Sequence, residues 1–348
     1  MHKKILVVIS ILLSMTLILT ACSSTDVQQN SETSSGNNSS GEQMTLKLGH
    51  VGPADDEHPW ERYAKILADR VKERTNGKVI IETYPNSQLG ADREMLEGMQ
   101  QGILDMGLIG TIAMTNFVPE YSVWDLPYIF PTDDNKKYEI IDGPIGQDLA
   151  AAAEKKGFKV LAYWHHSTRA LSNSKHPVEK LEDMKSLKIR VVENKPSLDW
   201  FGRIAIPTPM AFNELYTALQ QGTVDGQDNG PGLTYGSKLY EVQPYYTYTN
   251  HIYSVLALII SQKTWDKLPD DVKATLETLG REVGMEQREY SKQMEIEYGK
   301  RMEAAGVQIT YLSDEELKRF KESAQPTIEA LAPEIGEELV NRMLEYKD

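Results

Sequence analysis

The chain has 348 residues, 40% of them hydrophobic and 25% charged, and this ordinary globular composition excludes a disordered or fibrous protein. The length allows two domains with a sizeable core. The formal net charge of −14 argues against nucleic acid or an anionic membrane surface as the main partner.

The first 21 residues have the pattern of an export signal. Lys3 and Lys4 precede an apolar run that ends at Ala21, like the charged and hydrophobic regions of a signal peptide. The run closes with LTAC, the pattern of a bacterial lipoprotein box, so we expect a lipoprotein signal peptide over residues 1–21 and lipidation of Cys22. Acyl chains on Cys22 would hold the exported protein at the outer face of the cytoplasmic membrane. A transmembrane anchor is the alternative.

Cys22 is the only cysteine, so the exported chain cannot form an internal disulfide bond. The sequence that follows is rich in Ser, Asn and Gly and has few apolar residues, which is typical of a flexible linker. We therefore expect residues 22–43 to form a tether between the lipid and a folded domain.

Strand and helix patterns alternate from residue 44 onward. Gly77 and Gly102 follow the first two helical patterns as stop signals. The expected strands lie at 45–51, 78–85, 105–110, 158–164, 187–192 and 252–261, and the expected helices at 59–75, 92–101 and 212–221. This alternation predicts an α/β fold of two similar lobes joined by crossing strands. We assign residues 44–164 and about 255–290 to lobe I, and residues 165–254 and about 291–348 to lobe II.

A long helical region is expected after the last of these strands. Residues 270–305 contain no proline, many charges and many strong helix formers, so they should form one or two long helices. Gly280, Gly284 and Gly299 are candidate bends.

The strand in LKIRVVEN contains an arginine that needs a partner. Its apolar, β-branched pattern is typical of a short strand in a mostly covered sheet. Burying a guanidinium is costly unless an anion and further acceptors meet it. We therefore expect Arg190 to face either a carboxylate of this protein or a ligand.

Enzyme signatures are missing from the sequence, which has no GxSxG, P-loop, HExxH or GxGxxG motif. His165 and His166 are adjacent, so an extended segment points them to opposite faces, an arrangement unsuited to shared metal binding. We interpret His50 and His58 as polar loop residues. We expect no catalytic residue, no metal and no cofactor.

Several segments in chain order carry a family resemblance: PNSQLGADREMLEGMQQGILDMGLI, LPYIF, STRALSNSKHP, DMKSLKIRV, PTPMAFNELYTALQQGTVDGQDN and the helix after LPDDVK. Together they resemble the solute-binding proteins of tripartite ATP-independent periplasmic (TRAP) transporters, the DctP-like family, over about residues 45–306. The resemblance implies a two-lobed periplasmic-binding-protein fold with crossing hinge strands and a long bracing helix. It also implies a non-enzymatic protein that closes on a small organic acid and delivers it to a permease of a large and a small membrane subunit, driven by an ion gradient.

The resemblance assigns roles to the two arginines. The family's strand arginine binds the substrate carboxylate with two hydrogen bonds, and the matching residue is Arg190, whose planar fork suits a carboxylate. Arg169 matches a second arginine near the site, although Ser167 replaces the usual glycine two residues earlier. A surface or interlobe salt bridge is the alternative role for Arg169.

Further ligand-binding residues follow from the same resemblance. Asn229 matches the asparagine of the VDGQEN motif, although this chain has Asp228 and Gly230 on either side where the family has Glu and Pro. Phe212 matches an aromatic residue that lines the cleft, with a plain core position as the alternative.

Asp92 matches a position that reaches ligand hydroxyls in sugar-acid binders, although an acid in a first helical turn also complements the helix dipole. Trp164 is a candidate for stacking on the ligand, with a core position as the alternative. Gly110 stands where sialic-acid binders carry an acidic residue, which argues against sialic acid. The expected ligand is a C4-dicarboxylate or a sugar acid.

Two other functions stay open at this point. One is a binding component that serves a membrane sensor kinase instead of a permease. The other is a lipoprotein hydrolase that uses carboxylates, which requires two facing acids in the cleft.

Overall fold

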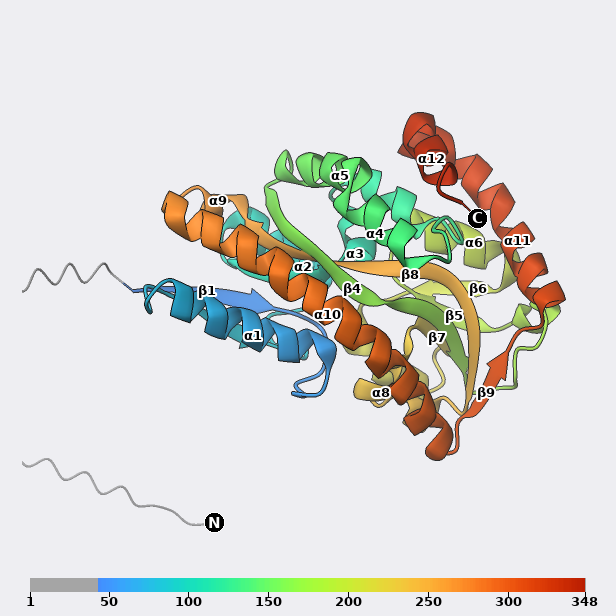
Figure 1. Ribbon diagram of the computed structural model, residues 1–348. Coiled ribbons are helices and arrows are strands. Elements are labelled where there is room, and N and C mark those ends of the chain that lie inside the picture. Colours follow the sequence, from blue (N-terminus) through green and yellow to red (C-terminus); the bar gives the residue numbers. More distant parts are fainter. Residues whose placement is uncertain (1–42, 348) are drawn as a thin grey trace, which may run out of the picture. The chain divides into compact units, whose positions relative to one another are not determined.

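A nine-stranded mixed β-sheet runs through residues 43–347, the part of the chain that the computed structural model describes (Figure 1). The strand order is β2-β1-β3-β8-β4-β7-β5-β6, and β9 pairs with β8 off this path. The strands are β1 Met44–Gly49, β2 Val79–Tyr84, β3 Met106–Gly110, β4 Phe158–Asn173, β5 Lys188–Val191, β6 Ile206–Pro209, β7 Gly226–Asn229, β8 Tyr245–Ser261 and β9 Gln308–Tyr311. The predicted signal peptide and Cys22 lie outside the described residues, as does the predicted tether up to residue 42.

Two long strands, β4 and β8, form the centre of this sheet and are called the hinge strands below. They pair with each other in antiparallel fashion, and their register shifts at three places along the pairing. β8 also pairs with β3, and β4 pairs with β7, so these two strands join the β1–β3 half of the sheet to the β5–β7 half. The predicted crossing strands are therefore confirmed.

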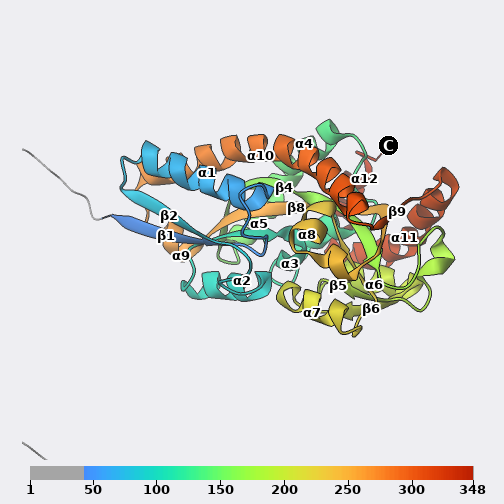
Figure 2. The same ribbon diagram turned by 90° about the horizontal axis from the view of Figure 1, so that it is seen from below.

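Helices cover both faces of the sheet, with α1 and α10 on one side and α2 and α7 on the other (Figure 2). The predicted region 270–305 forms a single helix, α10, which packs along β4, α1 and α8. The α-helices are α1 Pro59–Arg74, α2 Asp92–Gln101, α3 Thr111–Met114, α4 Asp134–Asp142, α5 Pro144–Glu154, α6 Lys195–Ile204, α7 Leu215–Gln220, α8 Pro231–Gly236, α9 Gln262–Trp265, α10 Asp270–Ala304, α11 Asp314–Ile335 and α12 Glu337–Leu344. The 3-10 helices are η1 Pro119–Asp125, η2 Leu181–Met184, η3 Phe212–Glu214 and η4 Leu239–Val242.

Two of the hydrophobic cores correspond to the two halves of the sheet. The larger contains the buried side chains of β1, β3 and the second part of β8, and the other contains those of β5 and α6. Helix α11 contributes to both, because Phe320 packs in the smaller core and Leu331 in the larger one. The C-terminal region thus contributes to both cores. The boundaries that we assigned to the two lobes stay a prediction.

Several parts of the secondary structure differ from expectation. The helix expected at 212–221 is divided into η3 and α7. The helices α4, α5, α6, α11 and α12 were not predicted from the sequence. Among the described residues, no helix is long and apolar enough to cross a membrane.

Candidate ligand-binding site

Three neighbouring strands bring the predicted polar residues together. Arg190 lies on β5 opposite Gln227 of β7, and Asn229 at the end of β7 pairs with Ala170 of β4, next to Arg169. Residues far apart in the sequence thus meet at one edge of the β5–β7 half, where β7 ends and α8 begins.

Arg190 is buried without a carboxylate partner among the described residues. Only 2% of the residue is exposed, and its Nε and Nη2 both donate to the backbone carbonyl of Met210, at 2.9 and 2.6 Å. Nη1 has no hydrogen-bond partner. The guanidinium carbon lies 5.9 Å from the centre of the Phe212 ring. Burial lowers the pKa of Arg190 to about 10, so the group stays charged at neutral pH with a free donor.

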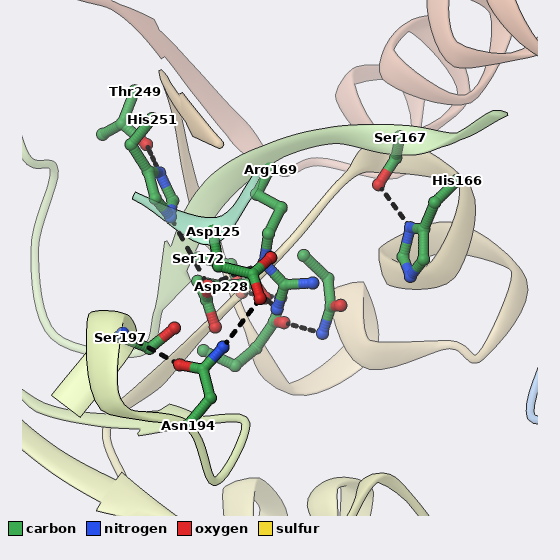
Figure 3. Close-up of polar contacts among 12 residues, drawn as sticks. Asp125, His166, Ser167, Arg169, Ser172, Asn194, Ser197, Asp228, Thr249 and His251 are labelled. Carbon is green, nitrogen blue, oxygen red and sulfur yellow. Dashed lines mark hydrogen bonds and ion pairs between the residues drawn. The ribbon is translucent and has the colours of Figure 1, made fainter. Parts of the chain in front are cut away.

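Arg169, in contrast, has an internal partner. Its Nε donates to Oδ2 of Asp228 at 2.8 Å and its Nη2 donates to the Asp228 backbone carbonyl, while Nη1 has no partner (Figure 3). His251 lies 3.4 Å from the same Oδ2, and its other ring nitrogen is 2.8 Å from Oγ1 of Thr249. Burial would raise the pKa of Asp228, but the Arg169 charge and the His251 bond hold it below the usual range. Asp228 therefore balances the charge of Arg169.

A second buried acid, Asp125, lies on the same side of Arg169 (Figure 3). Its Oδ2 accepts a 3.2 Å hydrogen bond from Asn194, which also caps helix α6 by accepting from the backbone N–H of Ser197. Burial raises the pKa of Asp125 well above its usual value despite the nearby Arg169 charge. The two acids beside Arg169 thus differ in charge, with Asp228 ionised and Asp125 favouring the neutral form.

Asp92 begins α2 and has a carboxyl oxygen, Oδ1, that is buried without a partner. Glu94 accepts from the N-cap N–H of Ala91 at 2.8 Å and so performs the capping. Burial raises the pKa of Asp92 to about 7, although the Arg190 charge opposes the shift. A methyl group on Gly110 would lie 3.7 Å from Oδ2 of Asp92 and 3.5 Å from Cδ2 of His166, so these residues are close neighbours.

The remaining two predicted site residues have different surroundings. Asn229 is 2% exposed, and its Nδ2 donates to Oε1 of Gln227 at 2.6 Å, so one of its amide donors is already used. Trp164 lies outside the group of polar residues around Arg190 and Arg169. It lies in the larger core, and its Nε1 donates to the Gly280 carbonyl of α10 at 2.9 Å, so core packing accounts for it.

Sequence reasoning missed several residues of this group, including His166, Asp125, His251 and the Met210 carbonyl. Asp228 was noted only as a difference from the family motif. We considered His166 only as a metal ligand together with its neighbour His165. No sequence motif indicated Asp125, His251 or the Met210 carbonyl. No group of three or more His, Cys, Asp or Glu side chains suited to a metal ion is present within residues 43–347.

The arrangement suits the capture of a small carboxylate. Two buried guanidinium N–H groups lack acceptors, and a carboxyl with a raised pKa and an amide lie near them. Buried polar groups normally have hydrogen-bond partners, so groups without one mark where a ligand would supply them. Fold and site together define a two-lobed binding protein for small organic acids.

Comparison with known proteins gives the family. Residues 48–334 match the model of bacterial extracellular solute-binding protein, family 7 (DctP). The chain belongs to this family and is a TRAP solute-binding protein, as the sequence motifs predicted.

Individual relatives cover most of the chain. The 2,3-diketo-L-gulonate-binding periplasmic protein YiaO of Escherichia coli is 32% identical over 80% of this chain and 84% of its own length. The C4-dicarboxylate-binding periplasmic protein DctP of Rhodobacter capsulatus is 33% identical over 86% and 90% of the two chains. The crystal structure of the sugar acid binding protein DctPAm of Advenella mimigardefordensis with galactonate aligns with a TM-score of 0.85 and 32% identity over 88% and 98% of the two chains.

Proposed function

We propose that this protein captures a hydroxylated monocarboxylate, such as an aldonate or uronate, outside the cytoplasm and delivers it to a TRAP permease. The observation that carries the proposal is the buried Arg190 guanidinium, which keeps its charge and has a free Nη1 but no carboxylate partner within the described residues. A ligand carboxylate supplies the missing anion. The protein itself catalyses no reaction in this proposal.

The charge balance supports a single ligand carboxylate. Asp228 neutralises Arg169, so the two arginines and this acid leave one net positive charge, at Arg190. In our proposal the ligand carboxylate accepts from Arg190, and the free Nη1 of Arg169 and the amide of Asn229 contact either the carboxylate or a hydroxyl. Asp92 hydrogen-bonds a ligand hydroxyl, and Phe212 covers the Arg190 contact.

The galactonate complex of DctPAm supports the sugar-acid assignment by similarity, whereas the Rhodobacter relative binds C4-dicarboxylates. A dicarboxylate is the second candidate, because Nη1 of Arg169 is free to donate to a second carboxylate. The hydrolase alternative has less support, since both acids beside Arg169 already bind neighbouring side chains.

We further propose that lipid on Cys22 and a tether over residues 22–43 hold the domain at the outer face of the cytoplasmic membrane. The permease partner in this proposal has a large and a small membrane subunit. Replacement of Cys22 by Ala should release the protein from the membrane fraction and abolish incorporation of labelled palmitate.

The ligand proposal is tested by a thermal-shift screen of the domain from residue 43 onward. The panel contains aldonates, uronates, C4-dicarboxylates and their uncharged sugar analogues. A ligand that binds the native state raises the melting temperature once its concentration exceeds the dissociation constant. We expect shifts from aldonates or uronates. A shift from succinate alone would favour the dicarboxylate, and a shift from the uncharged analogues alone would contradict the carboxylate site.

The role of Arg190 is then tested by calorimetry with the acid that gives the largest shift. Charge-assisted hydrogen bonds from one guanidinium contribute about 3 kcal/mol, so Arg190→Ala should weaken binding by about 100-fold or more. Arg190→Lys keeps the charge but loses the planar fork and should give an intermediate loss. Arg74→Ala is the matched control, because Arg74 is exposed and makes no ion pair with a described residue. Unchanged affinity in a folded Arg190→Ala variant would refute the assignment.

A further inference from the structure

A cavity of about 820 Å³ lies behind the hinge strands, and we call it the rear cavity. Thr168 of β4 lines it, whereas the next residue, Arg169, points to Asp228 at the ligand site. Since successive residues of a strand point to opposite faces, the rear cavity and the Arg169 side chain lie on opposite faces of β4, whereas His251 of β8 lines the cavity and also lies 3.4 Å from Oδ2 of Asp228. Its walls come from α4, β8, α10, β9 and α11, and the β8 residues that line it, Tyr248 to Tyr253, belong to the first half of that strand, beside β9 in Figure 1.

One wall of the rear cavity is flat and aromatic. The rings of Tyr248 and Tyr311 stack at 5.0 Å with an angle of 7° between their planes, and Tyr311 is 75% exposed. On α10, Ile296 borders the same cavity and is 64% exposed. Only five large apolar residues of the described chain are exposed, and Tyr311 and Ile296 are two of them. Their meeting at one cavity marks a place where a planar apolar group of a ligand can be covered.

The charge of the rear cavity is positive. Five lysines and three acidic residues line it, which leaves a net charge of 5 − 3 = +2. Asp134 pairs with Lys137 and Lys292, and Glu295 is bonded to His165. The five lysines are Lys137, Lys292, Lys300, Lys321 and Lys347, and the acids are Asp134, Glu295 and Glu303.

Three of the five lysines, Lys300, Lys321 and Lys347, make no ion pair with a carboxylate of the described residues. Lys300 on α10 and Lys321 on α11 are exposed and make no ion pair with a carboxylate of the described residues, and Glu303 is the lining acid that is left without an ion pair. A planar aromatic wall beside these unpaired ammonium groups complements an aromatic anion, and it disfavours a cation.

The rear cavity is seen here with the ligand site closed. Arg190 is only 2% exposed, and Glu193 joins the two halves of the sheet, because its carboxylate accepts from Arg93 at 3.1 Å and its backbone carbonyl accepts from Asn116 at 2.7 Å. Rotation about the hinge strands that opens the ligand site brings the rear walls toward each other. A molecule that fits the rear cavity in this form therefore binds the closed form better than the open one.

We propose that the rear cavity binds a planar aromatic carboxylate or sulfonate, and that this second ligand favours closure of the ligand site. The anionic group lies between Lys300 and Lys321, and the ring stacks on Tyr311. The two sites are then coupled through the hinge strands, and each ligand raises the affinity for the other.

The test uses 8-anilinonaphthalene-1-sulfonate, an aromatic anion whose fluorescence rises on binding, with its uncharged analogue N-phenyl-1-naphthylamine. We expect one sulfonate molecule per chain, and weaker binding of the uncharged analogue. The Lys300→Glu/Lys321→Glu variant should lose about tenfold or more in affinity for the sulfonate, since two attractive contacts become repulsive. The matched control is Lys155→Glu/Lys156→Glu, which changes the net charge equally at exposed positions outside the cavity.

Equal affinity of the two Lys→Glu variants would overturn the rear site, as would equal binding of the uncharged analogue. Closure is measured separately by small-angle X-ray scattering without any organic acid. Saturating sulfonate should reduce the radius of gyration of the wild type and leave the Lys300→Glu/Lys321→Glu variant unchanged. Binding without compaction would overturn the coupling. Neither readout depends on the acid proposed for the ligand site, so a failure here is distinct from a failure of that proposal.

Discussion

The Asp92 carboxyl changes its charge near neutral pH, because burial raises its pKa to about 7. Ligand acids have a pKa of about 4 and are ionised throughout this range. A ligand carboxylate on Arg190 repels ionised Asp92 but not neutral Asp92, so binding is linked to protonation. We expect the affinity of the wild type to fall by up to about tenfold per pH unit above pH 7.

Calorimetry at pH 6, 7 and 8 measures this dependence. The Asp92→Asn variant cannot ionise at this position and should bind with nearly the same affinity at all three values. An equal slope in the variant and the wild type would assign the dependence to another group, and a wild-type affinity that rises with pH would contradict the argument.

The sequence identified the charged groups of the candidate site better than their partners. Arg190 was recognisable because a guanidinium in a covered strand needs an acceptor, and the strand pattern around KIRV that placed it there is local. The pairing of Arg169 with Asp228 depends on β4 lying beside β7, a contact between residues 59 apart in the chain. Local patterns carry no information on such a partner, so Asp228 was described only as a motif difference.

Helix α10 shows why glycine is used inside a long helix. We considered Gly280, Gly284 and Gly299 as candidate bends, but the helix is continuous from Asp270 to Ala304. A methyl group on Gly284 would lie 2.5 Å from Cδ1 of Trp164, which is closer than side-chain atoms can approach. The glycine therefore lets α10 approach β4, where the Trp164 indole donates to the helix backbone.

The Gly284→Ala variant should consequently be less stable than the wild type. Alanine favours a helix over glycine by about 1 kcal/mol, while overpacking in a core costs about 1–3 kcal/mol. We expect a net loss of up to about 2 kcal/mol in the free energy of unfolding, measured with urea. Gly202→Ala in α6 is the control, since the nearest atom to its new methyl group is 4.0 Å away, and this change should be neutral or stabilising. Stabilisation by Gly284→Ala would show that Trp164 moves aside readily.

Element prediction succeeded where one local pattern covered a whole element. The helix at 92–101 was predicted with its observed bounds, since Gly102 follows it in the left-handed conformation that ends helices. β4 extends from Phe158 to Asn173, well past the predicted end at residue 164. The prediction stopped early because the second half of the strand contains polar residues such as Arg169, which interrupt the apolar pattern. α11 includes Pro326 and Pro333, which obscure a helical pattern.

The folded molecule buries histidines and aspartates whose contributions to stability change with pH in opposite directions. Burial lowers the pKa of His58 to about 3 and also lowers that of His166 and His251, so the folded chain keeps these rings neutral. Burial raises the pKa of Asp92 to about 7 and that of Asp125 well above its usual value, so the folded chain keeps these acids protonated. Between pH 5 and 6 the unfolded chain has the reverse charges, with its histidines mostly protonated and its aspartates ionised.

The two sets therefore act in opposite directions. A histidine kept neutral by folding makes the unfolded chain bind one more proton, so its contribution to stability increases with pH. An aspartate kept protonated makes the folded chain bind one more proton, so its contribution decreases with pH. Each proton corresponds to about 1.4 kcal/mol per pH unit. The histidines and aspartates cancel in part, and single substitutions expose the difference.

We expect urea unfolding between pH 5 and 6 to separate the variants by the sign of their slopes. His58→Asn keeps an N-cap residue for α1 and removes one histidine, so the slope of stability against pH should become about 1.4 kcal/mol per unit less positive than in the wild type. Asp92→Asn removes one aspartate, so its slope should become more positive by the same amount. The double variant should return to the wild-type slope, because the two removed protons have opposite sign. Slopes that shift in the same direction would mean that one of the two side chains is not held in its uncharged form by the fold.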